Sequence, residues 1–235
     1  PWMHTITDAE PHGTQPMSLR DIIVHSSNIG TLLLTDEVGT ERFGAYLESF
    51  GFGQKTALDF PNESAGLFKP ASEWQGTERQ SHSYGYGYSV TALQLAAAVN
   101  TVANGGVYVA PKLVEAVIGA DGEVTDTPAA ATHQVIQPAT AATMTDMMKG
   151  VVCEGTGKGA QIPGISVAGK TGTAQVFSLK GEEYRAHKVD ERLRDHAWFI
   201  AYAPAENPQI ALAVLVENGG FGAQSFFQLW SAEMF

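Results

Sequence analysis

Residues 167–177 read VAGKTGTAQVF, and most of what the sequence says about architecture starts here. Valine, threonine and phenylalanine are common in extended strands, so this stretch is a strand candidate. Two more strand candidates follow, residues 197–203 and 209–217, and only residues 204–208 connect them. Because so short a connection joins antiparallel neighbours, the last third of the chain predicts an antiparallel sheet.

Helical patterns dominate the chain before these strands. Ser18 with Asp21, and Thr91 with Gln94, have capping-box spacing, so one helix is predicted from Ser18 toward Asn28 and another behind Thr91. Two further helices are expected, one capped by Thr40 and closed by Gly51, and one over 140–153. A small hairpin over 107–124 is expected to turn at Asp121-Gly122. Residues 52–88 are expected to be irregular, and residues 155–159 to form a flexible turn. Helices first and antiparallel strands later indicate an α+β fold, with an antiparallel β-sheet flanked by helical layers.

Composition narrows the class of protein. The chain has 235 residues, of which 44% are apolar and 17% charged, as is ordinary for one globular domain. Its formal net charge of −11 gives no general attraction for phosphate backbones, so nucleic acid is not an expected partner. Cys153 is the only cysteine, which excludes an internal disulfide and a multi-cysteine zinc site. Because the first residue is Pro1, we expect a processed product or a piece of a longer protein.

Two short motifs carry candidate chemistry. Ser26-Ser27-Asn28 is a Ser-x-Asn triplet at the expected end of the first helix, and Lys170-Thr171-Gly172-Thr173 lies inside the first strand candidate. Taken alone, each also fits a purely structural role, as polar groups at a helix end or as a lysine on a strand edge. In this order and on these elements, they resemble two of the three signature motifs of penicillin-binding proteins and serine β-lactamases.

Longer blocks extend the resemblance from residue 8 to residue 220. SYGYG at 83–87 and VTALQLA at 90–96 are similar to division-type penicillin-binding proteins, as are residues 8–14 and 26–31; KTGTAQVF at 170–177, AHK at 186–188 and ERLRDH at 191–196 resemble the elongation-type enzymes. The chain is therefore identified as a member of the penicillin-binding transpeptidase family, with either branch open. The resemblance implies one partial transpeptidase domain over 1–235, with the fold of serine β-lactamases and D,D-peptidases, incomplete at its N-terminal side.

The resemblance assigns catalytic roles to four residues. Ser26 would relay a proton toward the leaving or entering amine, because a hydroxyl both donates and accepts. The Asn28 amide would hold a peptide group of the stem peptide, and Lys170 would supply positive potential for Ser26 and for the substrate carboxylate. The backbone N–H of Thr173 would form half of an oxyanion hole, a donor whose loss typically costs about 10²–10³ in rate.

Three neighbouring positions are implied to bind substrate. The hydroxyls of Thr171 and Thr173 would donate to the substrate carboxylate, and Gly172 would leave room for the acyl group along the strand. The resemblance implies no cofactor and no metal. A metal cluster at His187 and His196 is disfavoured, because their spacing of nine residues fits neither a helix face nor a zinc finger.

The third family motif, Ser-x-x-Lys with the acylated serine, is absent, because no serine of the chain has a lysine three positions later. The resemblance implies that this motif lies upstream of Pro1, together with early strands of the sheet and a membrane anchor. The chain alone is therefore predicted not to acylate, and an apolar strand edge beside residues 167–177 is expected to be exposed. Two departures from the family are Ala92, where proline is common, and residues 225–235, which do not read like its closing helix.

The function implied is that of a peptidoglycan D,D-transpeptidase at the extracytoplasmic face of the cytoplasmic membrane. Its partners would be stem peptides ending in D-Ala-D-Ala, β-lactams, a glycosyltransferase and other cell-wall synthesis proteins. Two alternatives stay open: a serine β-lactamase, for which the chain shows no deacylating base, and a non-catalytic β-lactam or peptidoglycan sensor. Three tyrosines either border the substrate groove or pack against other side chains of the protein: Tyr84, Tyr86 and Tyr88. Three methionines fit the buried face of a helix: Met144, Met147 and Met148.

Overall fold

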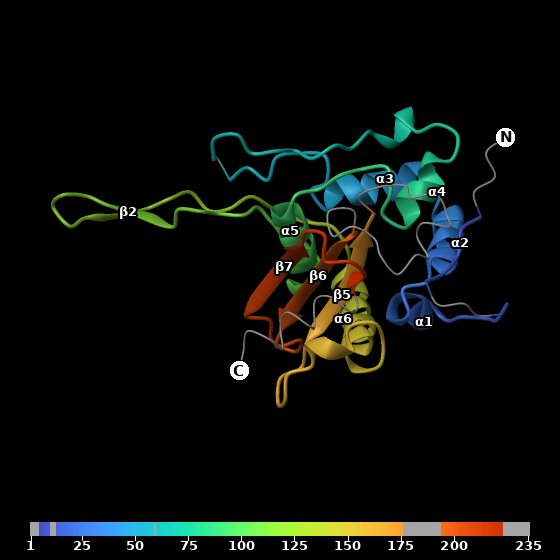
Figure 1. The fold of residues 1–235 in the computed structure, drawn as a ribbon. Coiled ribbons are helices and arrows are strands. Elements are labelled where there is room, and N and C mark those ends of the chain that lie inside the picture. The colour runs from blue at the N-terminus through green and yellow to red at the C-terminus, as the bar shows by residue number, and fades with distance from the viewer. Residues whose placement is uncertain (1–4, 10–12, 59, 176–193, 223–235) are drawn as a thin grey trace.

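The structure is a computed structural model, and it describes residues 5–9, 13–58, 60–175 and 194–222. Its helices are α1 Leu19–Val24, α2 Asn28–Val38, α3 Thr40–Ser49, α4 Glu78–Ser83, α5 Ala92–Ala103 and α6 Pro138–Cys153, with 3₁₀ turns η1 Ala71–Glu73 and η2 Lys158–Ala160. Its strands are β1 Val107–Val109, β2 Ala116–Ile118, β3 Val124–Asp126, β4 Thr132–Gln134, β5 Ala168–Ala174, β6 His196–Ala203 and β7 Ile210–Val216. The predicted α+β class is confirmed (Figure 1).

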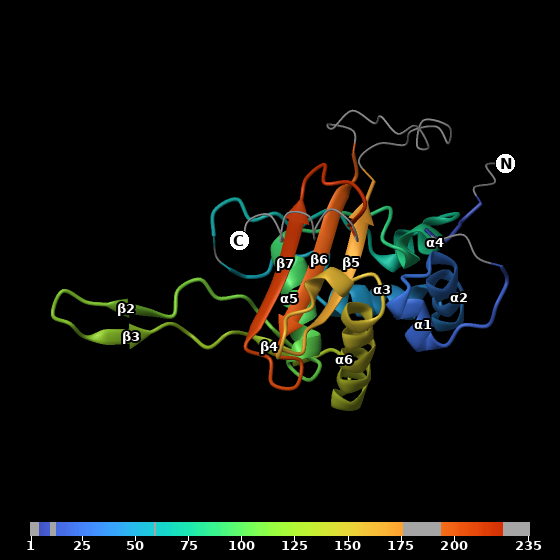
Figure 2. The same cartoon turned by 60° about the horizontal axis from the view of Figure 1, so that its bottom comes forward.

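One antiparallel sheet contains β5, β6 and β7 in that order. Lys170 of β5 lies opposite Ile200 of β6, which lies opposite Ala213 of β7. The three predicted strands and their antiparallel pairing are thus confirmed. Helix α6 packs on β5, while α5 packs on β6 and β7, so helices cover the sheet as expected (Figure 2).

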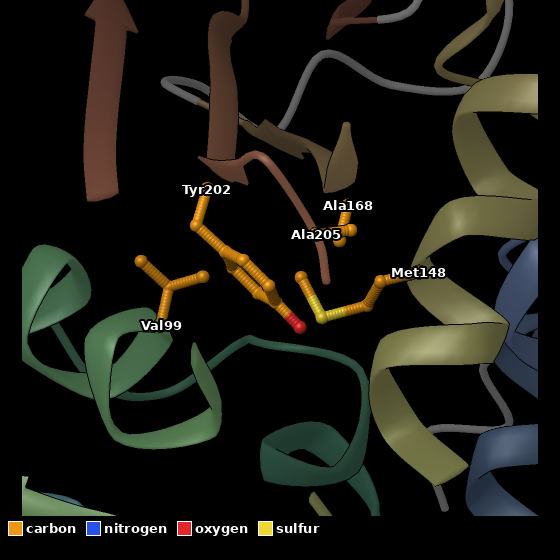
Figure 3. Packing of buried hydrophobic residues seen from close by; sticks show 5 residues of the cluster. All are labelled: Val99, Met148, Ala168, Tyr202 and Ala205. Atoms are coloured by element: carbon orange, nitrogen blue, oxygen red, sulfur yellow. The ribbon is translucent and has the colours of Figure 1, made fainter. Parts of the chain in front are cut away.

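The main core lies between this sheet and its two helices. Its buried members come from both layers and gather around one tyrosine ring (Figure 3): Val99, Met148, Ala168, Tyr202 and Ala205. The Tyr202 hydroxyl lies 2.6 Å from the Thr145 hydroxyl, so the polar end of this buried ring has a hydrogen-bond partner. The predicted methionine face of α6 is confirmed, because two of its members are buried and the third packs against the core: Met147, Met148 and Met144.

The first predicted helix, from Ser18 toward Asn28, is shorter than expected. The capping box at Ser18 is present and starts α1, but α1 ends well before Asn28. Ser26 has a φ of 57°, a left-handed conformation that a right-handed helix cannot continue. Ser27 then caps α2, where its hydroxyl accepts from a backbone N–H at 2.9 Å. The Ser-x-Asn triplet therefore lies across the turn between two helices, and its placement at the end of one helix is wrong.

The other predicted helix boundaries are accurate to about two residues, since α6 begins at Pro138, two residues before its predicted start. Thr91 and Gln94 form the reciprocal capping box at the start of α5, as predicted. Thr40 is the first helical residue of α3, and Gly39 occupies the cap position assigned to Thr40. Gly51 follows α3 with a φ of 95°, a conformation that glycine adopts without a steric penalty.

The predicted hairpin is present but longer than expected. Ile118 pairs with Val124, and the turn at Asp121-Gly122 closes when the Gly122 N–H donates to the Gly119 carbonyl at 3.0 Å. Strands β1 and β4 pair at its base, so the ribbon extends to residue 134 and projects from the rest of the molecule (Figures 1 and 2). Strand β4 escapes prediction because its residues, Thr-His-Gln, are polar and contain no apolar run.

Apolar strand surface is exposed on β7, at the opposite edge of the sheet from β5. The first residues of β5 are buried, since α6 packs on this strand. Strand β7 reads IALAVLV, yet its side chains are only partly buried and Ile210 is 65% exposed. The open strand edge predicted beside residues 167–177 is present among the described residues, because β5 pairs only with β6, and apolar side-chain surface is exposed on β7 as well.

Candidate active site

Strand β5 brings Lys170 to the turn between α1 and α2. Its Nζ donates to Ser26 Oγ at 2.7 Å and to the Thr171 carbonyl oxygen at 3.0 Å. Ser26 and Lys170 are 144 positions apart in sequence, so the tertiary structure creates this contact. Both partners accept hydrogen bonds, which suits a charged ammonium group with three donors.

Burial of the Lys170 ammonium lowers its pKa from the ordinary 10.5 to about 8. The side chain as a whole keeps some solvent exposure, but its charged end is surrounded by protein. An amine with this pKa is mostly charged at neutral pH and still exchanges a proton readily. The Ser26–Lys170 pair is therefore equipped both to attract an anion and to move a proton.

Asp8 holds the turn that carries Ser26. Its Oδ2 accepts from Ser27 Oγ at 2.7 Å, and its Oδ1 accepts from the Ile29 N–H at 3.0 Å. A carboxylate in this place also interacts favourably with the positive end of the α2 dipole. Sequence reasoning includes Asp8 in a block that resembles the family but assigns it no role, because a contact between residues 19 positions apart leaves no periodic signal.

Asn28 lies in the first turn of α2, and its amide is occupied elsewhere. Its Nδ2 donates to the Thr7 carbonyl oxygen at 3.0 Å. Within the described residues, no hydrogen bond joins the Asn28 side chain to Ser26 or Lys170. The predicted contact of this amide with a stem peptide stays a prediction.

Thr171 points its hydroxyl at a partner that the sequence did not suggest. Thr171 is 8% exposed, and its Oγ1 lies 2.6 Å from Thr156 Oγ1. Thr156 comes from the turn between α6 and η2, which sequence reasoning treats only as flexible. The signal available there was a threonine between Gly155 and Gly157, just ahead of the motif strand.

The end of β5 is covered closely by the segment after β7. The Gly222 N–H donates to Thr173 Oγ1 at 3.1 Å, and a Cβ on Gly222 would lie 2.1 Å from the Gly172 carbonyl oxygen. A Cβ on Gly172, in contrast, would meet only Trp198 Cβ, at an ordinary 3.4 Å. Packing among the described residues therefore does not require glycine at 172, and its predicted role toward an acyl group stays a prediction.

The three tyrosines have different surroundings. Tyr88 packs in an aromatic cluster, with its ring centroid 5.3 Å from that of His82. Tyr84 and Tyr86 lie against each other at 5.3 Å, and burial, with a smaller contribution from Asp195, raises the pKa of Tyr86 to about 12. Packing accounts for Tyr88, whereas the choice between groove and packing stays open for the other two.

His196 supports a loop of the sheet. Its Nδ1 accepts from the Asn218 N–H at 2.9 Å. His187 lies outside the described residues, as do residues 225–235. Over the described ranges, no three His, Cys, Asp or Glu side chains gather into a metal-binding group. The helices of those ranges include none with the length and apolarity needed to cross a bilayer.

Comparison with known proteins identifies the family that has this fold and these two motifs. Residues 2–229 match the model of the penicillin binding protein transpeptidase domain. The chain belongs to this family, as the resemblance of its motifs predicts.

Individual relatives fall in both functional branches. The chain is 37% identical to penicillin-binding protein PbpB of Mycolicibacterium smegmatis over 91% of its own length and 33% of the relative. It is 34% identical to the peptidoglycan D,D-transpeptidase MrdA of Acinetobacter baumannii over 97% of its length and 36% of the relative. The structure of penicillin binding protein 3 from Mycobacterium tuberculosis, complexed with aztreonam, is similar with a TM-score of 0.83 and 33% identity, over 97% of this chain and 53% of that one. The chain thus spans about a third of the length of these curated relatives.

Proposed function

We propose that this chain carries the Ser-x-Asn and Lys-Thr-Gly part of a peptidoglycan D,D-transpeptidase, which cross-links stem peptides through a serine acyl-enzyme. The observation that carries the proposal is the 2.7 Å contact between Lys170 Nζ and Ser26 Oγ. It joins both motifs in one site, beside a strand where a peptide can lie. The acylated serine belongs to a Ser-x-x-Lys motif that these 235 residues do not contain, so the chain by itself is inactive.

Ser26 serves as the proton relay in this proposal. The attacking serine forms an ester with the penultimate D-alanine as the C–N bond breaks, and the departing nitrogen needs a proton. Lys170 donates to Ser26 Oγ, which leaves the Ser26 hydrogen free to be passed to that nitrogen. The proton lost by the attacking serine balances the one gained by the amine. An incoming amine reverses these steps when it replaces the ester.

Thr173 donates its backbone N–H to the developing oxyanion. The Thr171 carbonyl accepts from Lys170 Nζ, so the backbone polar groups of Thr171 face the free edge of β5. Because those groups alternate sides along a strand, the Thr173 N–H faces the same edge. That placement supports a donor held in advance for the oxyanion, and it also leaves the Thr171 and Thr173 hydroxyls near a carboxylate bound along β5.

The reaction takes place at the extracytoplasmic face of the cytoplasmic membrane, on stem peptides that end in D-Ala-D-Ala. β-Lactams acylate the same serine, and a glycosyltransferase supplies the glycan strands. Two structures of Mycobacterium tuberculosis penicillin binding protein 3, complexed with aztreonam and with ampicillin, support β-lactams as ligands. The name of the Acinetobacter baumannii relative supports the reaction class.

Labelled penicillin tests this proposal in the complete gene product. The label is expected on a serine outside residues 1–235, the isolated chain is expected to take no label, and Ser26→Ala is expected to slow labelling of the complete protein. Release of the label with steady β-lactam turnover would identify a β-lactamase instead. Reversible binding without a covalent adduct would identify a sensor.

A further inference from the structure

Thr156 connects two parts of the candidate active site that are far apart in sequence. Its N–H donates to the Val24 carbonyl oxygen at 3.3 Å, at the end of α1. Its Oγ1 lies 2.6 Å from Thr171 Oγ1, on β5. One residue of the turn after α6 therefore contacts both the helix that leads to Ser26 and the strand that carries the Lys-Thr-Gly motif.

These contacts close a ring. Val24 lies two positions before Ser26 in the chain, and Ser26 Oγ accepts from Lys170 Nζ at 2.7 Å. Lys170 is bonded covalently to Thr171, and Thr171 returns to Val24 through Thr156. In a closed ring, no member shifts without lengthening a hydrogen bond elsewhere.

The backbone beside Thr156 is packed to make this approach close. A Cβ on Gly155 would lie 2.3 Å from the Val24 carbonyl oxygen and 2.9 Å from Val24 Cγ1. A Cβ on Gly157 would lie 3.2 Å from the Val151 carbonyl oxygen. The glycines on both sides of Thr156 thus let the turn that carries this residue lie against α1 and α6.

The number of hydroxyl hydrogens limits how Thr156 and Thr171 can bond to each other and to a ligand. A threonine hydroxyl has one hydrogen to donate and two lone pairs that accept. Among the described residues, Thr156 Oγ1 and Thr171 Oγ1 have no hydrogen-bond partner except each other, and one hydrogen lies between them. If Thr171 donates, it has no hydrogen left for a ligand. If Thr156 donates, the Thr171 hydrogen stays available.

We propose that Thr156 is a positioning residue: its hydroxyl donates to Thr171 Oγ1 and so turns the single Thr171 hydrogen toward the carboxylate of the substrate or of a β-lactam. A carboxylate only accepts hydrogen bonds, so bound ligand requires this direction of donation. The inference rests on the proposed function, in which Thr171 binds that carboxylate. Thr156 itself touches no reacting atom.

The test compares acylation of the complete protein by a penicillin and by its carboxyl methyl ester. Thr156→Val keeps the shape of the side chain but removes the donor, so acylation by the penicillin is expected to fall about tenfold. Acylation by the ester should change little, since the ester group lacks the anionic acceptor. Thr156→Ser keeps the hydroxyl and should retain the original rate with both reagents.

Thr145→Val is the matched control. Thr145 also pairs with a buried hydroxyl at 2.6 Å, that of Tyr202, and among the described residues neither of these hydroxyls is hydrogen-bonded to Ser26 or Lys170. This variant should lose stability without changing the ratio of the two acylation rates. In a Thr171→Val background, Thr156→Val should have no further effect on the penicillin rate, because its only target is gone.

The outcomes separate the two proposals. Loss of rate confined to the carboxylate reagent, rescued by serine, supports Thr156 as the positioning residue. Equal loss with both reagents, or no loss, overturns that role while the transpeptidase proposal stands. A native protein that takes no label from penicillin overturns the proposed function and the role of Thr156 with it.

Discussion

Lys170 is expected to set the alkaline limit of acylation in the complete protein. With a pKa of about 8, the ammonium is about 90% charged at pH 7 and about 10% charged at pH 9. Its Nζ donates to Ser26 Oγ and to the Thr171 carbonyl, so the charged form is the one that these two acceptors stabilise. Activity should therefore be present below pH 8 and be lost as the pH rises through it. The expected loss from pH 7 to pH 9 is about tenfold, whereas a lysine of ordinary pKa would lose only about 3% of its charge.

The assay is stopped-flow acylation by a chromogenic cephalosporin between pH 6 and pH 9.5. Lys170→Arg is the matched variant, because a guanidinium stays charged over this whole range. Its rate is expected to be lower, since arginine has a different shape, but to show no decline near pH 8. Circular dichroism at each pH shows that both proteins remain folded.

Two results would refute the reasoning about Lys170. One is a native rate that stays level up to pH 9.5, which would mean that the ammonium is not desolvated enough to titrate. The other is a Lys170→Arg profile with the same decline near pH 8, which would assign the titration to another group.

Three further substitutions test packing at the site and a buried hydrogen-bond network on α5. Gly155→Ala puts a Cβ 2.3 Å from the Val24 carbonyl oxygen, so the free energy of unfolding in urea should fall by about 1–3 kcal/mol, and an unchanged midpoint would disprove the clash. The Cβ added by Gly172→Ala would meet only Trp198 Cβ, at 3.4 Å, so the free energy of unfolding should stay within about 0.5 kcal/mol of the native value. The acylation rate should nevertheless fall about 10²-fold, and a full rate would show that no acyl group lies over this position. Gln94→Leu leaves two backbone carbonyls without the amide that donates to them at 2.9 Å, so urea unfolding should show a loss of about 2–3 kcal/mol, against no loss if water replaces the amide.

Local chemistry explains where prediction from sequence succeeds. The capping boxes at Ser18 and Thr91 depend on residues three positions apart, so the sequence contains all of their partners. Strands β6 and β7 are visible because most of their side chains are aromatic, β-branched or apolar, whereas β5 is visible through its threonines and the valines and phenylalanine of residues 167–177. The break at Ser26 is missed because polar residues suit a helix end and a turn between two helices equally well.

The sequence alone determines which chemical groups these 235 residues contain and in what order: a Ser-x-Asn triplet and a Lys-Thr-Gly-Thr strand, without a Ser-x-x-Lys among them. Motif order suffices to predict the family, which the domain match confirms. Only the tertiary structure decides that Lys170 reaches Ser26, that its burial lowers its pKa to about 8, and that Thr171 pairs with Thr156. The reason is physical: hydrogen-bond distances and desolvation depend on which atoms surround a group in space, and sequence spacing says nothing of neighbours 144 positions away.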